Sequence, residues 1–239
     1  MILTKVNLQP KYSKVTAITA TIICSAFALW SLVWFWSSVL TVRPEVVITQ
    51  WEHSSEKVNQ ELAIQMIARL KQSIAINPLN ANSQLLLARY YEALTSAEPN
   101  QYSPLVEQAY KKAIKHQPSW DYAWTRLAIF YSNQKVVNEA KLITALSTAM
   151  SLGPYESKSH PLLIPLIFKH WQLITSNKQT KHQEQAIKIV KHALSYSHAL
   201  LTLNSAKKYQ QLTTLAPLLT KQWPKNFVKK HLKVATNDQ

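Results

Sequence analysis

The chain has 239 residues, a formal charge of +15 and a single glycine, Gly153. Phosphate-binding loops and dinucleotide-binding folds need several glycines where the backbone approaches a ligand, so the composition excludes them, and it disfavours hairpin-rich all-β folds. The only cysteine, Cys24, excludes an intramolecular disulfide and a cysteine-based zinc site. The composition favours an all-α fold, because helices need no glycine.

The first element is an apolar segment over residues 15–40, which are 26 positions without a charged residue. As a helix this segment is about 39 Å long, enough to cross a hydrocarbon core of roughly 30 Å with some tilt. Trp30, Trp34 and Trp36 cluster toward its C-terminal end, and indole rings favour the headgroup boundary. We therefore predict a transmembrane helix. The alternative is a buried helix of a soluble protein, which rarely extends this far without a charge.

Flanking charges predict the orientation of this helix. Residues 1–14 carry Lys5, Lys11 and Lys14 and no acidic residue, whereas Arg43 is balanced by Glu45 after the span. The positive-inside rule then makes residues 1–14 a cytoplasmic tip. We expect a single-pass protein of the inner (cytoplasmic) membrane, with its C-terminal domain in the periplasm or otherwise outside the cytoplasm.

Processing of the N-terminal segment is a second question. The stretch Ala26-Phe27-Ala28 resembles a signal-peptidase site. The apolar run continues beyond it, however, which favours an uncleaved anchor. Ile23 is too large for the position before a lipidated cysteine, which argues against a lipoprotein. Ala20, Cys24 and Ala28 are small residues four positions apart, a spacing that lets membrane helices pair but that is also common in unpaired spans.

Residues 41–56 are largely polar and contain Pro44, so we predict a linker, with Ser54 or Ser55 capping the next helix. Helical periodicity follows, and Asn77-Pro78 ends it. The apolar residues that share one face of this helix are Leu62, Met66, Ile67, Leu70 and Ile74.

Two consecutive segments then share a pattern of small and aromatic residues. The first contains Leu87-Ala88-x-x-Tyr91 followed by Val106-x-x-x-Tyr110-x-x-Ala113, and the second contains Trp124-x-x-Leu127-Ala128-x-x-Tyr131 followed by Ala140. The alanines allow paired helices to pack closely, and the aromatic residues fill the space between units. Pro78, Pro118 and Pro154 punctuate the pattern at intervals of 40 and 36 residues. The pattern resembles the tetratricopeptide repeat, whose usual period is about 34 residues.

This resemblance implies an all-α fold in which one N-terminal transmembrane helix precedes an α-α superhelix over residues 57–200, and residues 201–239 form a helical cap and basic tail. It implies an insertion over residues 95–104 that lengthens the loop inside the first unit, and a weaker third unit around Ala186, Val190 and Ala193. It also implies a partner-binding groove, unless the same positions are merely solvated. The groove positions are Asn82, Arg89, Glu92, Tyr122, Thr125 and Asn133.

The architecture also resembles VpsP-type proteins, which are encoded in bacterial exopolysaccharide gene clusters. The shared features are the basic tip, one span, the Arg43-Pro44-Glu45 sequence and a divergent repeat domain of this size. This resemblance implies a role in exopolysaccharide biosynthesis or export.

Residues suited to catalysis are scarce. The two aspartates, Asp121 and Asp238, are far apart in sequence, and neither a Gly-x-Ser-x-Gly nor a His-Glu-x-x-His motif occurs. The eight histidines include no i,i+4 pair, so we predict that they are exposed or cap helices. We expect no enzymatic activity, no cofactor and no metal site.

The positive charge lies in the C-terminal half, because residues 111–239 hold 19 basic and 5 acidic residues. Such a surface suits an anionic polysaccharide or lipid headgroups, or it is simply solvated. Nucleic acid is a poor candidate outside the cytoplasm. The lysines predicted to contact such an anionic surface are Lys111, Lys112, Lys115, Lys229, Lys230 and Lys233.

From these features we predict a membrane-anchored scaffold that binds protein partners in a membrane-associated complex and assists exopolysaccharide biosynthesis or export. Two alternatives remain open at this point. One is an envelope assembly factor, such as a cytochrome-maturation protein of the tetratricopeptide type. The other is a module that binds an anionic glycan directly.

Overall fold

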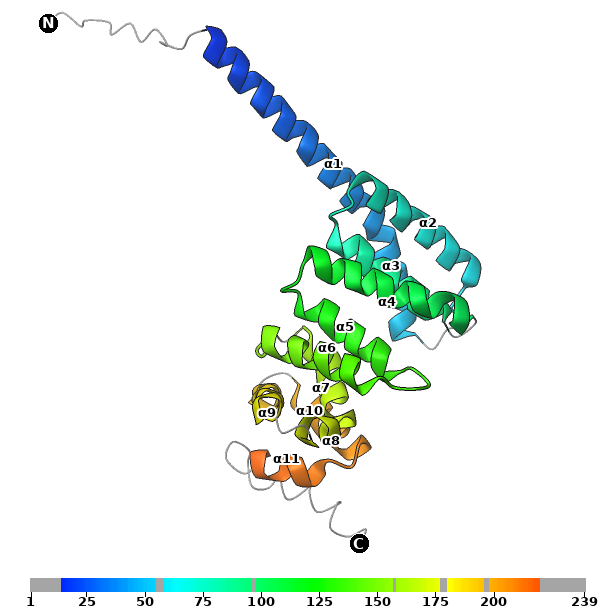
Figure 1. The fold of residues 1–239 in the computed structure, drawn as a ribbon, viewed down its shortest axis with the longest axis vertical. Coiled ribbons are helices and arrows are strands. Elements are labelled where there is room, and N and C mark those ends of the chain that lie inside the picture. The colour runs from blue at the N-terminus through cyan, green and yellow to red at the C-terminus, as the bar shows by residue number, and fades with distance from the viewer. Residues whose placement is uncertain are drawn as a thin grey trace, which may run out of the picture.

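The computed structural model describes residues 14–54, 58–95, 98–156, 158–176, 180–195 and 198–219, with the backbone alone for 216–219. The described residues form helices joined by short connections and contain no strand, which confirms the all-α prediction (Figure 1). The helices are α1 (Lys14–His53), α2 (Gln60–Ile76), α3 (Ala81–Leu94), α4 (Pro99–His116), α5 (Asp121–Ser132), α6 (Glu139–Leu152), α7 (His160–Lys169), α8 (Trp171–Ser176), α9 (Thr180–Ser195), α10 (Ala199–Lys208) and α11 (Leu212–Leu219).

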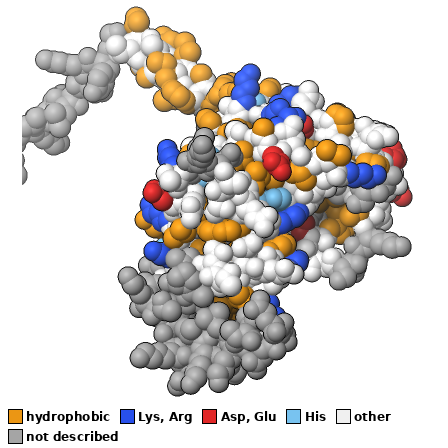
Figure 2. Space-filling model, turned by 60° about the horizontal axis from the view of Figure 1, so that its bottom comes forward, with side chains coloured by type: hydrophobic (Ala, Val, Ile, Leu, Met, Phe, Trp, Pro, Cys, Tyr) orange, Lys and Arg blue, Asp and Glu red, His pale blue; other side chains and the backbone are white. Residues whose placement is uncertain are grey.

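Helix α1 is long and apolar enough over its first half to cross a membrane. Its 18-residue window of highest hydropathy has no residue buried against the rest of the protein. Phe27, Trp30 and Phe35 each keep at least 60% of their surface exposed. This half projects from the helical body (Figures 1 and 2), so its apolar surface is available to a surrounding lipid phase.

The predicted linker at residues 41–56 is wrong for residues 41–53, because α1 continues through them to His53. Proline inside a helix removes one backbone hydrogen bond and usually bends or ends the helix. Here packing offsets that cost, because Pro44 is buried and its carbonyl accepts a hydrogen bond of 2.7 Å from the Tyr90 hydroxyl. Ile48, one turn later, is 1% exposed.

Helix α2 begins at a different cap from the one predicted. The side chain of Asn59 accepts a hydrogen bond from the Leu62 backbone N–H, so Asn59 and not Ser54 is the N-cap. Ser55 lies outside the described residues. Asparagine satisfies the free N–H groups of a first helical turn as well as serine does, so the sequence did not distinguish these candidates.

A buried polar cluster attaches α1 to α2 and α3. The hydroxyls of Ser37 and Ser73 lie 2.8 Å apart, and the Asn80 side chain donates to Ser37 Oγ at 3.1 Å. Ser83 extends the cluster, with its hydroxyl 2.8 Å from that of Ser73. Because these serines are buried, their hydrogen bonds hold α1 in one register against the next two helices.

Beyond α1 the helices pack in successive pairs, with α3 against α4 and α5 against α6. Ala88, Ala113 and Ala128 are fully buried where these helices meet, as predicted. Ala140 is exposed, which contradicts its predicted packing role, and the buried alanines of α6 are Ala145 and Ala149. The error is one of register, because the α5–α6 connection places Ala140 at the very start of α6.

Two predicted boundaries also change. Residues 99–104, expected in a loop, form the first turns of α4, which has 18 residues against 14 in α6. The predicted boundary at 200/201 falls inside α10. That helix packs against α7 and α9, so it belongs with the helices of the third unit and not with a separate cap. Ala186, Val190 and Ala193 lie buried on one face of α9 as expected.

A glycine is needed at position 153 because the side chain of Asp121 lies very close to it, and not because of the backbone angles at this position. A Cβ atom at this position would lie 2.8 Å from Cγ and 2.9 Å from Cβ of Asp121. The Asp121 carboxylate accepts a hydrogen bond from Ser159, which precedes α7. An alanine at position 153 would therefore displace the side chain that joins α5 to the start of α7.

We expect Gly153→Ala to lower the free energy of unfolding by about 1 kcal/mol, because the steric and hydrogen-bond losses exceed the stabilisation that comes from a lower conformational entropy of the unfolded chain. Thermal unfolding of the full chain in detergent measures this change. In an Asp121→Gly background, which removes the Cβ atom as well as the carboxylate, the same substitution should be neutral or stabilising. An equal loss in both backgrounds would show that Asp121 is not the cause.

Candidate partner-binding surfaces

Charged side chains from three helices meet where α1 ends. Glu52 of α1 accepts two hydrogen bonds from Arg89 of α3, at 3.1 Å from Nε and 2.6 Å from Nη2. Arg126 of α5 donates a third at 2.7 Å. Two guanidinium groups on one carboxylate make a strong, oriented contact. Burial raises the pKa of Glu52, but the arginines outweigh it and hold that pKa below its ordinary value.

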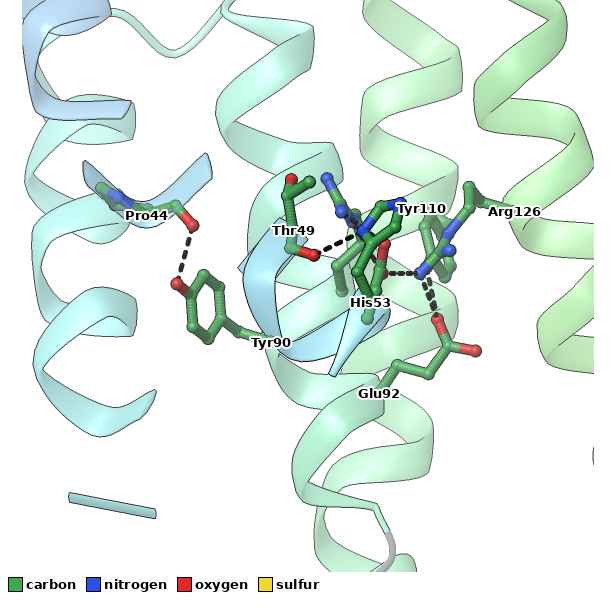
Figure 3. Close-up of polar contacts among 9 residues, drawn as sticks. Pro44, Thr49, His53, Tyr90, Glu92, Tyr110 and Arg126 are labelled. Carbon is green, nitrogen blue, oxygen red and sulfur yellow. Dashed lines mark hydrogen bonds and ion pairs between the residues drawn. The ribbon is translucent and has the colours of Figure 1, made fainter. Parts of the chain in front are cut away.

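Glu92 of α3 completes this cluster. It lies 3.4 Å from Arg126 and accepts a hydrogen bond of 2.6 Å from the hydroxyl of Tyr110 on α4 (Figure 3). Burial raises the pKa of Glu92 despite the nearby guanidinium. The same burial, together with the Glu92 carboxylate, raises the pKa of Tyr110. The cluster therefore links α1, α3, α4 and α5 through groups that are costly to leave unpaired.

A pocket of about 240 Å³ lies beside the charged cluster. Its apolar wall comes from α1, from Val58 just before α2, and from α3. Its polar wall is the charged cluster. The lining residues are Ile48, Trp51, Glu52, Val58, Arg89, Glu92, Ala93 and Arg126. The glutamates contribute the more accessible charge, because the side chains of Glu52 and Glu92 are 31% and 22% exposed against 6% and 10% for Arg89 and Arg126.

Two further pockets are lined by residues at corresponding places in successive helices. One, of about 230 Å³, lies between α2, α3 and α4. The other, of about 410 Å³, lies between α4, α5 and α6. The first is lined by Lys71, Ile74, Gln84, Leu87 and Tyr91, and 40 positions later the second is lined by Lys111, Ile114, Trp124, Leu127 and Tyr131. Leu105, Gln108 and Ala109 correspond at an interval of 36 to Lys141, Thr144 and Ala145. The same arrangement therefore recurs along the chain.

Beside the larger pocket, Glu107 joins α4 to α5 and α6. It accepts from Lys111 at 2.7 Å, from Lys141 at 2.9 Å and from the Tyr131 hydroxyl at 3.0 Å. Partial burial alone would raise the pKa of Glu107, but these three donors lower it to about 2. Both lysines that line this pocket, Lys111 and Lys141, are thus paired with a carboxylate rather than free to bind an anion.

The structure brings together only two of the six predicted groove residues. Arg89 and Glu92 line the pocket beside the charged cluster. Asn133 is exposed and lines a separate pocket near Lys169. Asn82 and Tyr122 are half-buried and line none of these pockets. Thr125 has no exposed surface and donates to the Asp121 carbonyl, so its prediction as a groove residue is wrong.

The six lysines predicted to contact an anionic surface do not form one group either. Lys111 is paired with Glu107, and Lys112 lines the smaller of the two recurring pockets. Lys115 is exposed near the end of α4. Lys229, Lys230 and Lys233 lie outside the described residues.

Sequence reasoning missed Glu52, Arg126 and Tyr110 as members of the charged cluster. The sequence pattern predicts a linker at Glu52 and a packing role alone for Tyr110. The available signal was Arg126, a cation between Thr125 and Leu127 on a largely apolar helix. A long-chain cation in such a segment usually has a buried anionic partner.

The prediction that the histidines are exposed or cap helices is wrong for His160, because it is buried and Ser159 is the N-cap of α7. His160, the first residue of α7, is fully buried, and its ring centroid lies 5.3 Å from that of His192 and 6.0 Å from that of His198. Among the described residues no group of three potential ligands has a geometry suited to a metal ion. His170 follows α7, and its Nε2 lies 2.6 Å from the Ser132 hydroxyl.

These histidines predict a loss of stability in mild acid. Burial, and then Lys169, lowers the pKa of His170 to about 4, and burial with His192 and His198 lowers the pKa of His160. An unfolded histidine titrates near 6.5, so between about pH 6.5 and pH 4 the unfolded chain binds more protons than the folded chain. The free energy of unfolding therefore falls as the pH falls through this window.

After allowance for solvent screening, we expect His170 to account for about 1 kcal/mol of that loss at pH 5. Thermal unfolding of the full chain at pH 7.5 and pH 5 measures it. The control is the His160→Gln/His170→Gln variant, whose amides do not titrate. Its midpoint should fall less than that of the wild type, and an equal fall in both would contradict the assignment.

Comparison with known proteins adds no relative. No protein-family model, no curated protein and no solved structure matches this chain.

Proposed function

We propose that this chain is a non-catalytic, membrane-anchored scaffold of the tetratricopeptide type, which docks a protein partner on the face built by α1, α3 and α5. The observation that carries the scaffold architecture is the recurrence of pocket-lining positions at intervals of 40 and 36 residues, and the pocket beside the charged cluster supports the choice of docking face. Stacked helix pairs that repeat equivalent residues are typical of scaffolds, because each added pair extends one continuous binding surface.

The apolar half of α1 is the proposed anchor. Its exposed apolar side chains suit lipid, and the lysines before it favour a cytoplasmic tip with the domain outside the cytoplasm. Anchoring confines the domain to two dimensions and raises its effective concentration toward membrane-bound partners, so weak contacts suffice. A reporter fused after Gln239 should be active outside the cytoplasm, and activity confined to the cytoplasm would reverse this orientation.

The pocket beside the charged cluster indicates what kind of segment docks there. Trp51, Val58 and Ala93 supply an apolar wall. Glu52 and Glu92 supply the accessible charge, which is negative. A partner segment that fits carries an apolar side chain for the pocket and a lysine or arginine for the carboxylates.

For the process that this scaffold serves, we propose exopolysaccharide biosynthesis or export, on the strength of the resemblance to VpsP-type proteins. An envelope assembly role remains the second proposal. Photo-crosslinking in living cells distinguishes the two. Benzoylphenylalanine replaces Ala93, which lines the pocket, or Ala68, an exposed alanine of α2 that lines none of the pockets described above.

A discrete adduct is expected from position 93 and not from position 68. An adduct with a polymerase, glycosyltransferase or polymer exporter supports the polysaccharide role, whereas one with a haem-handling protein supports the assembly role. No adduct at position 93, or the same adducts from both positions, would contradict docking on this face.

A further inference from the structure

The level of Ser37 along α1 locates part of the domain relative to the proposed membrane. A hydrocarbon core of roughly 30 Å accommodates about 20 helical residues, and each headgroup layer adds about 5–7 Å, or roughly four residues. A span that begins at Val15 therefore leaves the hydrocarbon near residue 35. Ser37 then lies in the headgroup layer, directly after Trp34 and Trp36.

The turn between α2 and α3 lies at this same level. Ser37 is fully buried because the last turn of α2 and the first cap of α3 pack on it. Its hydroxyl lies 2.8 Å from that of Ser73 and accepts from Asn80 at 3.1 Å. Figure 1 shows this turn beside the point where α1 enters the domain. Residues 77–80 are therefore held next to the headgroup end of the span.

This turn has the composition of an interfacial segment. No charged residue occurs from Gln72 to Ala88. Leu79 is 55% exposed, although a leucine in water gains about 25 cal/mol for each Å² that it buries in an apolar phase. The structure buries the neighbouring Asn77 and leaves Leu79 outside.

The corresponding turn one unit later is different. It lies 40 positions further on, between α4 and α5, where Leu79 corresponds to the exposed Ser119. Gln72, Ala75 and Ile76 correspond to Lys112, Lys115 and His116. The two turns occupy equivalent places in the repeated unit, but only the one beside the span follows a helix end without basic residues and presents an exposed leucine.

We propose that the α2–α3 turn inserts into the lipid headgroup layer beside the anchor, with Leu79 toward the acyl chains. The domain thus contacts the membrane at two places, which fixes its rotation about α1. This inference rests on the proposed anchoring of α1.

The test uses the full chain in vesicles of three parts phosphatidylcholine to one part phosphatidylglycerol. An environment-sensitive NBD fluorophore is attached at one cysteine at a time, at native Cys24, or at Leu79→Cys or Ser119→Cys in a Cys24→Ser background. Both new positions are exposed, so neither substitution disturbs the core. Nitroxide-bearing lipids then quench the probe according to its depth.

We expect the probe at 79 to be blue-shifted and quenched at least about threefold more than the probe at 119, and the probe at Cys24 to be quenched most by nitroxides deep in the acyl chains. A probe at 79 that is as accessible to water as the one at 119, with Cys24 in the lipid, would overturn the placement of the turn alone. A probe at Cys24 outside the lipid would overturn the anchor and the turn together.

Discussion

Arg126→Ala should lower the free energy of unfolding by about 3 kcal/mol, which corresponds to a fall of roughly 6–12 °C in the unfolding midpoint. The arginine side chain is 10% exposed and contacts both Glu52 and Glu92. Its removal leaves Glu92 beside Glu52 with less compensating charge. The expected loss stands at the lower end of the range for buried ion pairs because both glutamates keep some access to water.

The pH dependence of this loss identifies its cause. Burial already raises the pKa of Glu92, and removal of Arg126 raises it further. A protonated Glu92 no longer repels Glu52, so the penalty for Arg126→Ala should be smaller at pH 5 than at pH 7.5. The Glu92→Gln/Arg126→Ala variant should recover part of the stability at neutral pH. Lys135→Ala, on the exposed α5–α6 connection, is the control and should change the free energy by less than about 0.5 kcal/mol. An Arg126→Ala variant as stable as this control would contradict the role of the cluster.

The second large effect concerns the part of α1 that follows the apolar run. Ile48→Asp should cost about 3 kcal/mol or more, because Ile48 is 1% exposed and a carboxylate there is desolvated, while the nearby Arg89 and Arg126 are already paired with Glu52. Val46→Asp, two positions earlier on the same helix, should cost less than about 1 kcal/mol, because Val46 is 52% exposed. Both substitutions carry the same helix propensity cost, so their difference reports burial alone.

The measurement is the unfolding midpoint of the full chain in detergent or nanodiscs, with far-UV circular dichroism as the readout. If residues 41–53 were a solvated linker, both substitutions would be equally harmless. Equal effects of Ile48→Asp and Val46→Asp would therefore contradict the docking of α1 on α3.

The helical fold class was predictable because it depends on local properties. A single glycine, a regular helical period and proline at the ends of units indicate helices that pack in pairs. The packing roles of Ala88, Ala113 and Ala128 were predictable for the same reason, since a small residue at the same place in successive units has few other uses.

The role of residues 41–53 was not predictable from local pattern. Polar residues around Pro44 indicate a break in a helix, and only the hydroxyl of Tyr90 and the burial of Ile48 show why the helix continues. The predicted register of α6 failed in a similar way. Ala140 has the right residue type, but the start of the helix, set by the side chain of Asn138, leaves it exposed.

The charged cluster depends on proximity that no local pattern contains. Glu52 and Arg126 are 74 positions apart in sequence, and Glu92 and Arg126 are 34 apart. Arg89 and Glu92 were selected as groove residues from a repeat position, and both line the pocket. Their partners are Glu52, which lies in a segment predicted as a linker, and Tyr110, which lies at a position predicted to pack. The charged cluster is therefore visible only in the structure.

We propose that one helix, α1, is both the membrane anchor and the first packing helix of the domain. Disulfide formation in native membranes tests it most directly, between Ser37→Cys and Ser73→Cys in a Cys24→Ser background, under mild oxidation, with free thiols counted by maleimide-polyethylene glycol. The two hydroxyl oxygens lie 2.8 Å apart, so nearly complete disulfide formation is expected, whereas Ser37→Cys with Ser147→Cys on α6 should stay reduced. Two free thiols at positions 37 and 73 in the membrane-embedded chain would show that α1 does not pack on the domain as described.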